Sequence, residues 1–110
     1  MESDLLARDS KLREIVHRLV EAYKPERIYL FGSKARGDDG GESDYDIMVV
    51  VYSSGEPSYR RAQKAYRILR GIDTAVDVLV WTKQAFDSRL HLKASFPSTI
   101  VREGKLLYVA

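Results

Sequence analysis

The sequence contains no cysteine among its 110 residues. This absence excludes disulfide bonds, thiolate metal sites and cysteine nucleophiles, and it is compatible with a reducing compartment. The first residues, MESDLLARDSK, lack the basic and then apolar pattern of a signal peptide. The longest apolar run, residues 47–52, is far too short to cross a bilayer. We therefore expect a cytoplasmic protein without a membrane-spanning segment.

Neither sign of charge dominates the chain. Lysine and arginine number 18 and aspartate and glutamate 16, which gives a net charge of +2. Such a small excess neither requires nor excludes a nucleic-acid partner, and direct nucleic-acid binding is not expected. The composition, 45% hydrophobic and 31% charged, is typical of a globular protein. A chain of this length is the size of one domain, predicted at residues 1–110.

Apolar residues recur at helical spacing in some segments and form short strand-like runs in others. The helical pattern and its stop signals predict helices at residues 12–23, 33–37, 58–70 and 97–104, with another after Thr82. Short apolar segments predict strands at residues 27–31, 45–51 and 75–81, and a final strand or extended tail at 105–109. A loop should run through Ser43. This order predicts an α/β fold, with a mixed β-sheet packed against helices.

Three aspartates lie in or next to two of the predicted strands, at residues 45–51 and 75–81. Asp44 and Asp46 are two residues apart, so they should project from the same face while Tyr45 points away. Asp77 lies between valines of the strand at 75–81, where an uncompensated carboxylate is costly. If these strands are neighbours, the three carboxylates can converge on one or two Mg²⁺ ions. Alternatively, Asp44 and Asp46 belong to a turn, and Asp77 is an edge residue or the partner of a basic side chain.

The residues Gly32 and Ser33 close one predicted strand and open a helical turn. Glycine lets a phosphate approach the backbone, and the N–H groups of the turn and the Ser33 hydroxyl can hold phosphate oxygens. Lys34 and Arg36 add positive charge, so all four residues are candidates for nucleotide binding. Ser33 could instead be a plain helix cap, and the two cations could simply be solvated.

Gly32-Ser33, ten further residues and Asp44-x-Asp46 together form the signature G-S-x(10)-D-x-D. With it the chain resembles the nucleotidyltransferase superfamily that includes DNA polymerase beta. The segments GSKARG, SDYDIMV and VDVLV resemble more closely the minimal nucleotidyltransferases, which are the antitoxins of HEPN/MNT toxin–antitoxin pairs. The resemblance covers most of the chain, except for the first helix and the part after about residue 85.

The resemblance implies an enzyme that binds ATP with Mg²⁺ and transfers AMP to an acceptor hydroxyl. In the antitoxins the acceptor is a tyrosine of the partner HEPN ribonuclease, and its modification silences the toxin. Applied to this chain, the resemblance implies that Gly32 and Ser33 hold the triphosphate and that Asp44 and Asp46 bind the metal. Asp77 binds the metal and helps to deprotonate the acceptor hydroxyl. A hetero-oligomer with the toxin is then expected.

Two other functions are compatible with the same motifs. A nucleotidyltransferase could modify a small-molecule hydroxyl such as that of an aminoglycoside, although such enzymes generally use an added domain to hold the acceptor. An antitoxin could also block its toxin by contact alone, without catalysis. The basic residues of the predicted helix 58–70 are either solvated or a docking surface for a partner: Arg60, Arg61, Lys64, Arg67 and Arg70.

Overall fold

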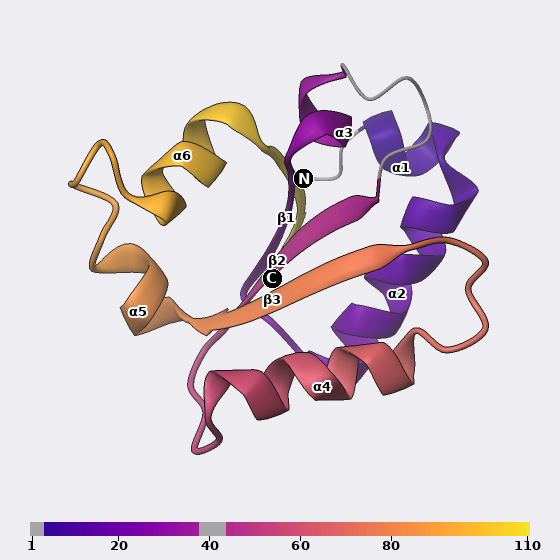
Figure 1. Cartoon of the computed structure of the whole chain (residues 1–110), viewed down its shortest axis with the longest axis horizontal. Helices are drawn as coiled ribbons and strands as arrows, with labels where there is room; N and C mark the ends of the chain where they lie inside the picture. Colours follow the sequence, from indigo (N-terminus) through magenta and orange to yellow (C-terminus); the bar gives the residue numbers. More distant parts are fainter. Residues whose placement is uncertain (1–3, 38–43) are drawn as a thin grey trace.

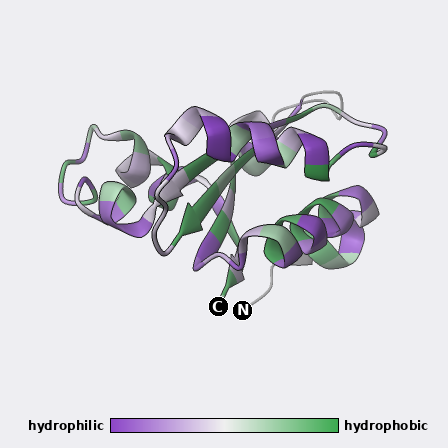
Figure 2. Ribbon diagram, turned by 90° about the horizontal axis from the view of Figure 1, so that it is seen from below, coloured by the Kyte–Doolittle hydropathy of each residue, from purple (hydrophilic) through white to green (hydrophobic). Residues whose placement is uncertain are grey.

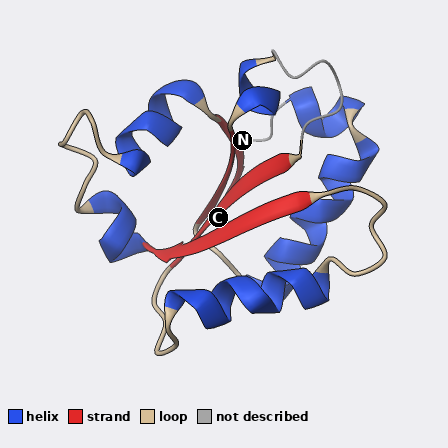
Figure 3. Ribbon diagram, viewed as in Figure 1, coloured by secondary structure: helices blue, strands red, loops and turns tan. Residues whose placement is uncertain are grey.

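Four strands form one mixed sheet in the computed structural model, which describes residues 4–37 and 44–110 (Figure 3). They are β1 Arg27–Phe31, β2 Tyr45–Val51, β3 Val76–Thr82 and β4 Lys105–Val109. Their order across the sheet is β3-β2-β1-β4. β1 pairs antiparallel with β2 and β4, whereas β2 and β3 run parallel. The predicted α/β fold with a mixed sheet is confirmed.

The strand bounds follow the sequence pattern closely. The predictions for residues 27–31 and 45–51 are confirmed, and β3 begins one residue later than predicted. The final segment is a strand rather than an extended tail, because its backbone pairs with β1 at one edge of the sheet. The predicted loop through Ser43 lies outside the described residues.

Helices cover both faces of the sheet. They are α1 Asp4–Arg8, α2 Ser10–Tyr23, α3 Ser33–Arg36, α4 Ser58–Ile68, α5 Lys83–Asp87 and α6 Phe96–Glu103. Helices α2 and α4 pack on one face, and α5 and α6 pack on the other (Figure 1). Within the part of the chain that the structure describes, no helix is both long and apolar enough to cross a membrane.

Strand β2 contributes alternate side chains to two hydrophobic clusters. Ile47, Val49 and Val51 belong to the cluster beneath α2 and α4, whereas Met48 and Val50 pack with residues of α5 and α6. Figure 2 shows the strands as the most hydrophobic part of the molecule, with hydrophilic residues mainly on the helices. Because side chains alternate along a strand, Asp46 lies on the same face as Met48 and Val50.

The basic helix α4 is only partly a solvated surface. The Arg61 Nε donates to the Val80 carbonyl of β3 at 3.0 Å, and the Lys64 ammonium lies 5.2 Å from the centre of the Tyr23 ring. These two cations therefore fix α4 to its neighbours. Arg60 and Arg67 on the same helix are exposed.

Candidate active site

The register of the two parallel strands brings two of the three predicted carboxylates together. Asp46 of β2 is paired directly with Asp77 of β3, and Phe31 of β1 is paired with Asp46 from the other side. Tyr45 is buried in the opposite cluster, and its hydroxyl donates to Asp9 Oδ2 at 2.7 Å. This anchor fixes the start of β2, so the predicted orientation, with Asp46 facing away from Tyr45, is the one observed.

A glycine makes room for the Asp46 carboxylate. Gly32 has φ +77°, a backbone conformation that other residues rarely adopt. A Cβ added there would overlap Asp46 Oδ2 and would lie 3.2 Å from its Cγ. The carboxylate of Asp46 therefore lies against the backbone at the point where α3 begins. This contact joins the Gly-Ser turn and the Asp-x-Asp strand into one site.

The electrostatics of the site disfavour a negative charge on Asp46. Partial burial raises the pKa of the Asp46 carboxyl, and the carboxylates of Asp77 and Asp44 raise it further. The positive charge of Arg36 acts in the opposite direction. Such a set of oxygen donors, held near one another at the cost of mutual repulsion, suits a hard divalent cation. The donors thus fit Mg²⁺ in their chemistry.

The three carboxylates do not form a closed ligand set as they stand. Among residues 4–37 and 44–110, no three acidic or histidine side chains are grouped closely enough to hold one ion. Asp44 is exposed and precedes β2, so it contributes through its charge on Asp46 rather than through a strand pairing. The structure brings Asp46 and Asp77 together, and Asp44 stands at the margin of the pair.

Hydration compensates the carboxylate of Asp77, whose position among valines would otherwise make it costly. Asp77 is the second residue of β3, β3 is an edge strand, and the side chain is exposed. Its carboxylate therefore keeps most of its hydration. The alternative of an edge residue describes its position correctly, and what distinguishes Asp77 is its pairing with Asp46.

The remaining predicted residues occupy α3. Ser33 is the first residue of this helix and is not its cap, because Gly32 occupies that position without a side-chain hydrogen bond. The Lys34 ammonium lies 4.6 Å from the centre of the Tyr45 ring, on the side of β2 opposite to Asp46. Arg36 is exposed at the end of the helix. Of the two cations, Arg36 is the one whose charge reaches Asp46.

Aromatic residues that the sequence analysis did not connect with the site lie beside it. Phe31, the neighbour of Asp46, meets Phe96 edge to face with ring centres 5.3 Å apart. Phe96 in turn meets Trp81 at 5.9 Å. No local sequence signal joins these rings, because they come from β1, α6 and β3. The cluster forms an apolar border on the carboxylate face of the sheet.

Comparisons with known proteins agree on one family. The model of the nucleotidyltransferase domain family matches residues 10–107. Over 103 residues the chain is 28% identical to "Putative protein adenylyltransferase MJ0604" of Methanocaldococcus jannaschii, an alignment that covers 91% of this chain and 97% of that protein. A second protein of the same organism, "Putative protein adenylyltransferase MJ1379", is 43% identical over 54 residues, which is 46% of this chain and 54% of that protein.

Solved structures show the same fold. A crystal structure of "a putative nucleotidyltransferase from Sulfolobus solfataricus" superposes with a TM-score of 0.63 at 27% identity, covering 94% of this chain and 87% of that one. A crystal structure of a toxin-antitoxin with AMP-PNP gives a TM-score of 0.57 at 28% identity, covering 89% and 73%. The chain belongs to the nucleotidyltransferase domain family, as its Gly-Ser and Asp-x-Asp motifs predicted, and it is a nucleotidyltransferase.

Proposed function

We propose that this chain is an antitoxin that transfers AMP from ATP, with Mg²⁺, to a tyrosine hydroxyl of a partner HEPN ribonuclease toxin in the cytoplasm. The observation that carries the proposal is the contact of Gly32 with Asp46 and the pairing of Asp46 with Asp77. These two contacts bring a turn that is suited to binding phosphate next to carboxylates that are suited to binding a divalent cation. The chain that carries them belongs to the nucleotidyltransferase family.

Each residue of the site has a role in this reaction. Gly32 and Ser33 would hold the triphosphate at the start of α3, where the backbone can approach phosphate oxygens. Asp44, Asp46 and Asp77 would hold Mg²⁺, which when bound neutralises charge on the phosphates and orients attacking and leaving oxygens. Arg36 would stabilise the phosphates, since its charge already acts at Asp46. Lys34 is a weaker candidate, because its ammonium lies over the Tyr45 ring.

At the α-phosphorus of ATP, the transfer makes one bond and breaks one bond. The acceptor oxygen attacks the α-phosphorus of ATP, and the bond from that phosphorus to the oxygen bridging to the β-phosphate breaks. Pyrophosphate leaves with the electron pair of the broken bond, and AMP remains on the acceptor oxygen. The exposed Asp77 carboxylate, on the outer strand of the pair, would accept the proton of the attacking hydroxyl.

The comparisons support a protein as the acceptor. The matched proteins of Methanocaldococcus jannaschii are named as protein adenylyltransferases, and one superposed structure is a toxin-antitoxin with AMP-PNP. A further one, a variant of the MntA-HpeT toxin-antitoxin, superposes with a TM-score of 0.57 at 25% identity over 90% of this chain and 72% of that one. These properties belong to those proteins and make the same activity the best-supported one here.

Mass spectrometry of mixed proteins tests the proposal. The chain is incubated with ATP, Mg²⁺ and a candidate HEPN-family partner, for which the adjacent reading frame is searched first. We expect the partner to gain one or more AMP units on tyrosine and to lose its ribonuclease activity. An unmodified but inhibited partner would instead indicate an antitoxin that acts by contact alone. Efficient transfer to an aminoglycoside hydroxyl without a partner would indicate a small-molecule enzyme.

The same assay separates the roles of the carboxylates. Asp77→Asn should lose most of the transfer while it keeps part of the ATP affinity, because Asp77 is proposed to act on the acceptor. Asp46→Asn should lose both. If Asp77→Asn transferred AMP at the wild-type rate, Asp77 would have no role in the reaction and would be an ordinary residue of an edge strand.

A further inference from the structure

A concave surface lies on the other side of α3 from the carboxylates. It is a cleft of about 460 Å³ between α1, α3 and the start of β4. Four cationic side chains from these three elements line it, above an apolar floor of Leu5 and Ala35: Arg8, Lys34, Arg36 and Lys105. No acidic residue is among its lining residues in the described part of the chain. Among the described residues, the charged groups that line the cleft are therefore all positive.

Two of these cations have no acidic partner among the residues that the structure describes. Neither Arg8 nor Lys105 makes an ion pair or a side-chain hydrogen bond with any residue in the described ranges, and both are exposed. Asp9, the acid next to Arg8 in sequence, is already engaged. Its Oδ1 accepts from the Leu12 N–H and its Oδ2 from the Tyr45 hydroxyl. Arg8 and Lys105 share one cleft and repel each other, so an anion that enters between them is favoured.

We propose that this cleft is a metal-independent binding site for a compact oligophosphate, such as a triphosphate group. A triphosphate concentrates several charges within the space of one cleft and accepts hydrogen bonds from ammonium and guanidinium groups. An extended acidic peptide is a poorer match, because its residues lie about 3.3 Å apart and alternate in direction. A nucleic-acid strand is also a poorer match, since none of the described residues that line the cleft has an aromatic ring to stack on its bases.

The cleft is distinct from the proposed nucleotide site but adjoins it. Arg36 belongs to both, because it lines the cleft and its charge reaches Asp46. Arg8 and Lys105 belong to the cleft alone. An anion bound here needs no divalent cation, whereas a phosphate beside Asp46 and Asp77 is repelled unless a cation intervenes. Anion binding measured without metal therefore reports on the cleft and not on the proposed nucleotide site.

Calorimetric titration with inorganic tripolyphosphate in the presence of EDTA tests the inference. We expect saturable binding to the wild-type chain and an affinity at least about tenfold lower for Arg8→Glu/Lys105→Glu. Arg60→Glu/Arg70→Glu changes the net charge equally at exposed positions of α4 and the turn after it, and should keep the wild-type affinity within about twofold. The milder Arg8→Gln/Lys105→Gln should give an intermediate loss.

Other outcomes would overturn the site. These are no saturable binding by the wild-type chain, or equal losses in the two Glu double variants, which would indicate a general charge effect. Tighter binding of hexaglutamate than of tripolyphosphate would assign the cleft to an acidic peptide. A large gain of metal-free affinity in Asp46→Asn would place the anion at the carboxylates, because the variant removes a charge that repels it there. The titration contains neither Mg²⁺ nor a partner, so its result is independent of the AMP-transfer assay.

Discussion

At the scale of single residues, the site depends on a glycine and a carboxylate that need each other. Gly32 has a positive φ, and its missing side chain leaves the space that Asp46 occupies. Gly37, at the other end of α3, has nearly the same φ, +79°, but a Cβ added there would meet no atom within 4 Å. The two glycines share a positive φ, but Gly32 has ψ −160°, a region almost restricted to glycine, whereas Gly37 has ψ 15°, in the left-handed helical region.

This pair gives a matched test of the Asp46 contact. Gly37→Ala should lower the free energy of unfolding by about 1 kcal/mol, because alanine is strained in the left-handed region. Gly32→Ala should lower it by about 1–3 kcal/mol, because its backbone conformation is less accessible still to alanine. Only Gly32→Ala should displace the Asp46 carboxylate, so it alone should lose most of its Mg²⁺-dependent ATP affinity in calorimetry. Equal ATP affinities for the two variants would show that the Gly32 contact is not needed for the nucleotide.

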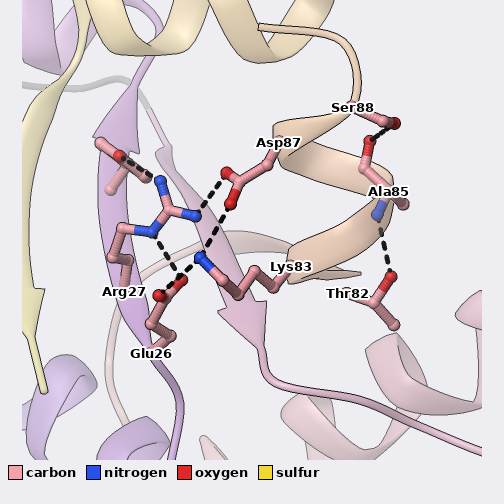
Figure 4. Close-up of polar contacts among 8 residues, drawn as sticks. Glu26, Arg27, Thr82, Lys83, Ala85, Asp87 and Ser88 are labelled. Carbon is pink, nitrogen blue, oxygen red and sulfur yellow. Dashed lines mark hydrogen bonds and ion pairs between the residues drawn. The ribbon is translucent and has the colours of Figure 1, made fainter.

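At the scale of secondary-structure elements, a network of charges fixes α5 to the beginning of β1 (Figure 4). The Arg27 guanidinium donates to Asp87 Oδ1 at 2.6 Å and to Glu26 Oε1 at 2.9 Å. The Lys83 ammonium donates to the second oxygens of both carboxylates, at 2.9 Å and 3.0 Å. Phe86 of the same helix is buried, and the Arg27 guanidinium carbon lies over its ring, 5.2 Å from the ring centre. Polar and apolar contacts thus hold α5 against the beginning of β1.

The pKa of each carboxyl in this network depends on its cationic partners. Burial alone would raise the pKa of Asp87 and of Glu26, but the hydrogen bonds from Arg27 and Lys83 outweigh it and lower both. A carboxyl whose folded pKa is depressed contributes stability above its unfolded pKa, and this contribution is lost as the pH falls through the folded pKa. The network should therefore stabilise the protein at neutral pH and fail below about pH 4.

We expect Arg27→Met to lower the free energy of unfolding by about 1–3 kcal/mol at pH 7, because two carboxylates lose a partly buried partner. The loss should shrink below about pH 4, where wild type also loses the network. Arg60→Met on the exposed face of α4 is the control and should change the stability by less than about 0.5 kcal/mol. Urea unfolding at several pH values measures both. A pH-independent loss in Arg27→Met would reduce its role to packing on Phe86.

At the scale of the whole molecule, the fold places mutually repelling carboxylates at one end of an otherwise apolar sheet. β2 is buried from Ile47 to Val51, whereas Asp46 at its start is only partly buried and Asp77 is exposed. A protein selected only for stability would not keep this arrangement, because the raised pKa of Asp46 means that its charged form opposes folding. Stability and ligand binding are therefore opposed in this protein.

Neutralising the charge should reveal this opposition. Without metal, Asp46→Asn should melt on the order of 1–4 °C above wild type, because the repulsion from Asp77 and Asp44 is relieved. Mg²⁺ with ATP should raise the melting temperature of wild type, since a ligand that binds only the folded state stabilises it. The variant should gain little. A lower melting temperature for metal-free Asp46→Asn would contradict this account and favour a structural role for the carboxylate.

The sequence by itself determined the parts of the site that depend on local spacing. Gly32 and Ser33 end a strand and begin a turn, and Asp46 follows an alternation that must turn it away from Tyr45. These features need no distant contact, so the family and the bounds of β1 and β2 could be predicted. The strand at 105–109 remained ambiguous, because only its pairing with β1 makes it a strand.

Only the tertiary structure decided which residues meet across the chain. The pairing of Asp46 with Asp77 depends on the register of two parallel strands, which is set by packing on both faces of the sheet. The exposure of Asp77 follows from the edge position of β3, which its apolar sequence does not show. Arg8 and Lys105 come from opposite ends of the chain and share a cleft because α1 and β4 both lie beside α3. Such meetings arise from long-range packing, which no local pattern of residues encodes.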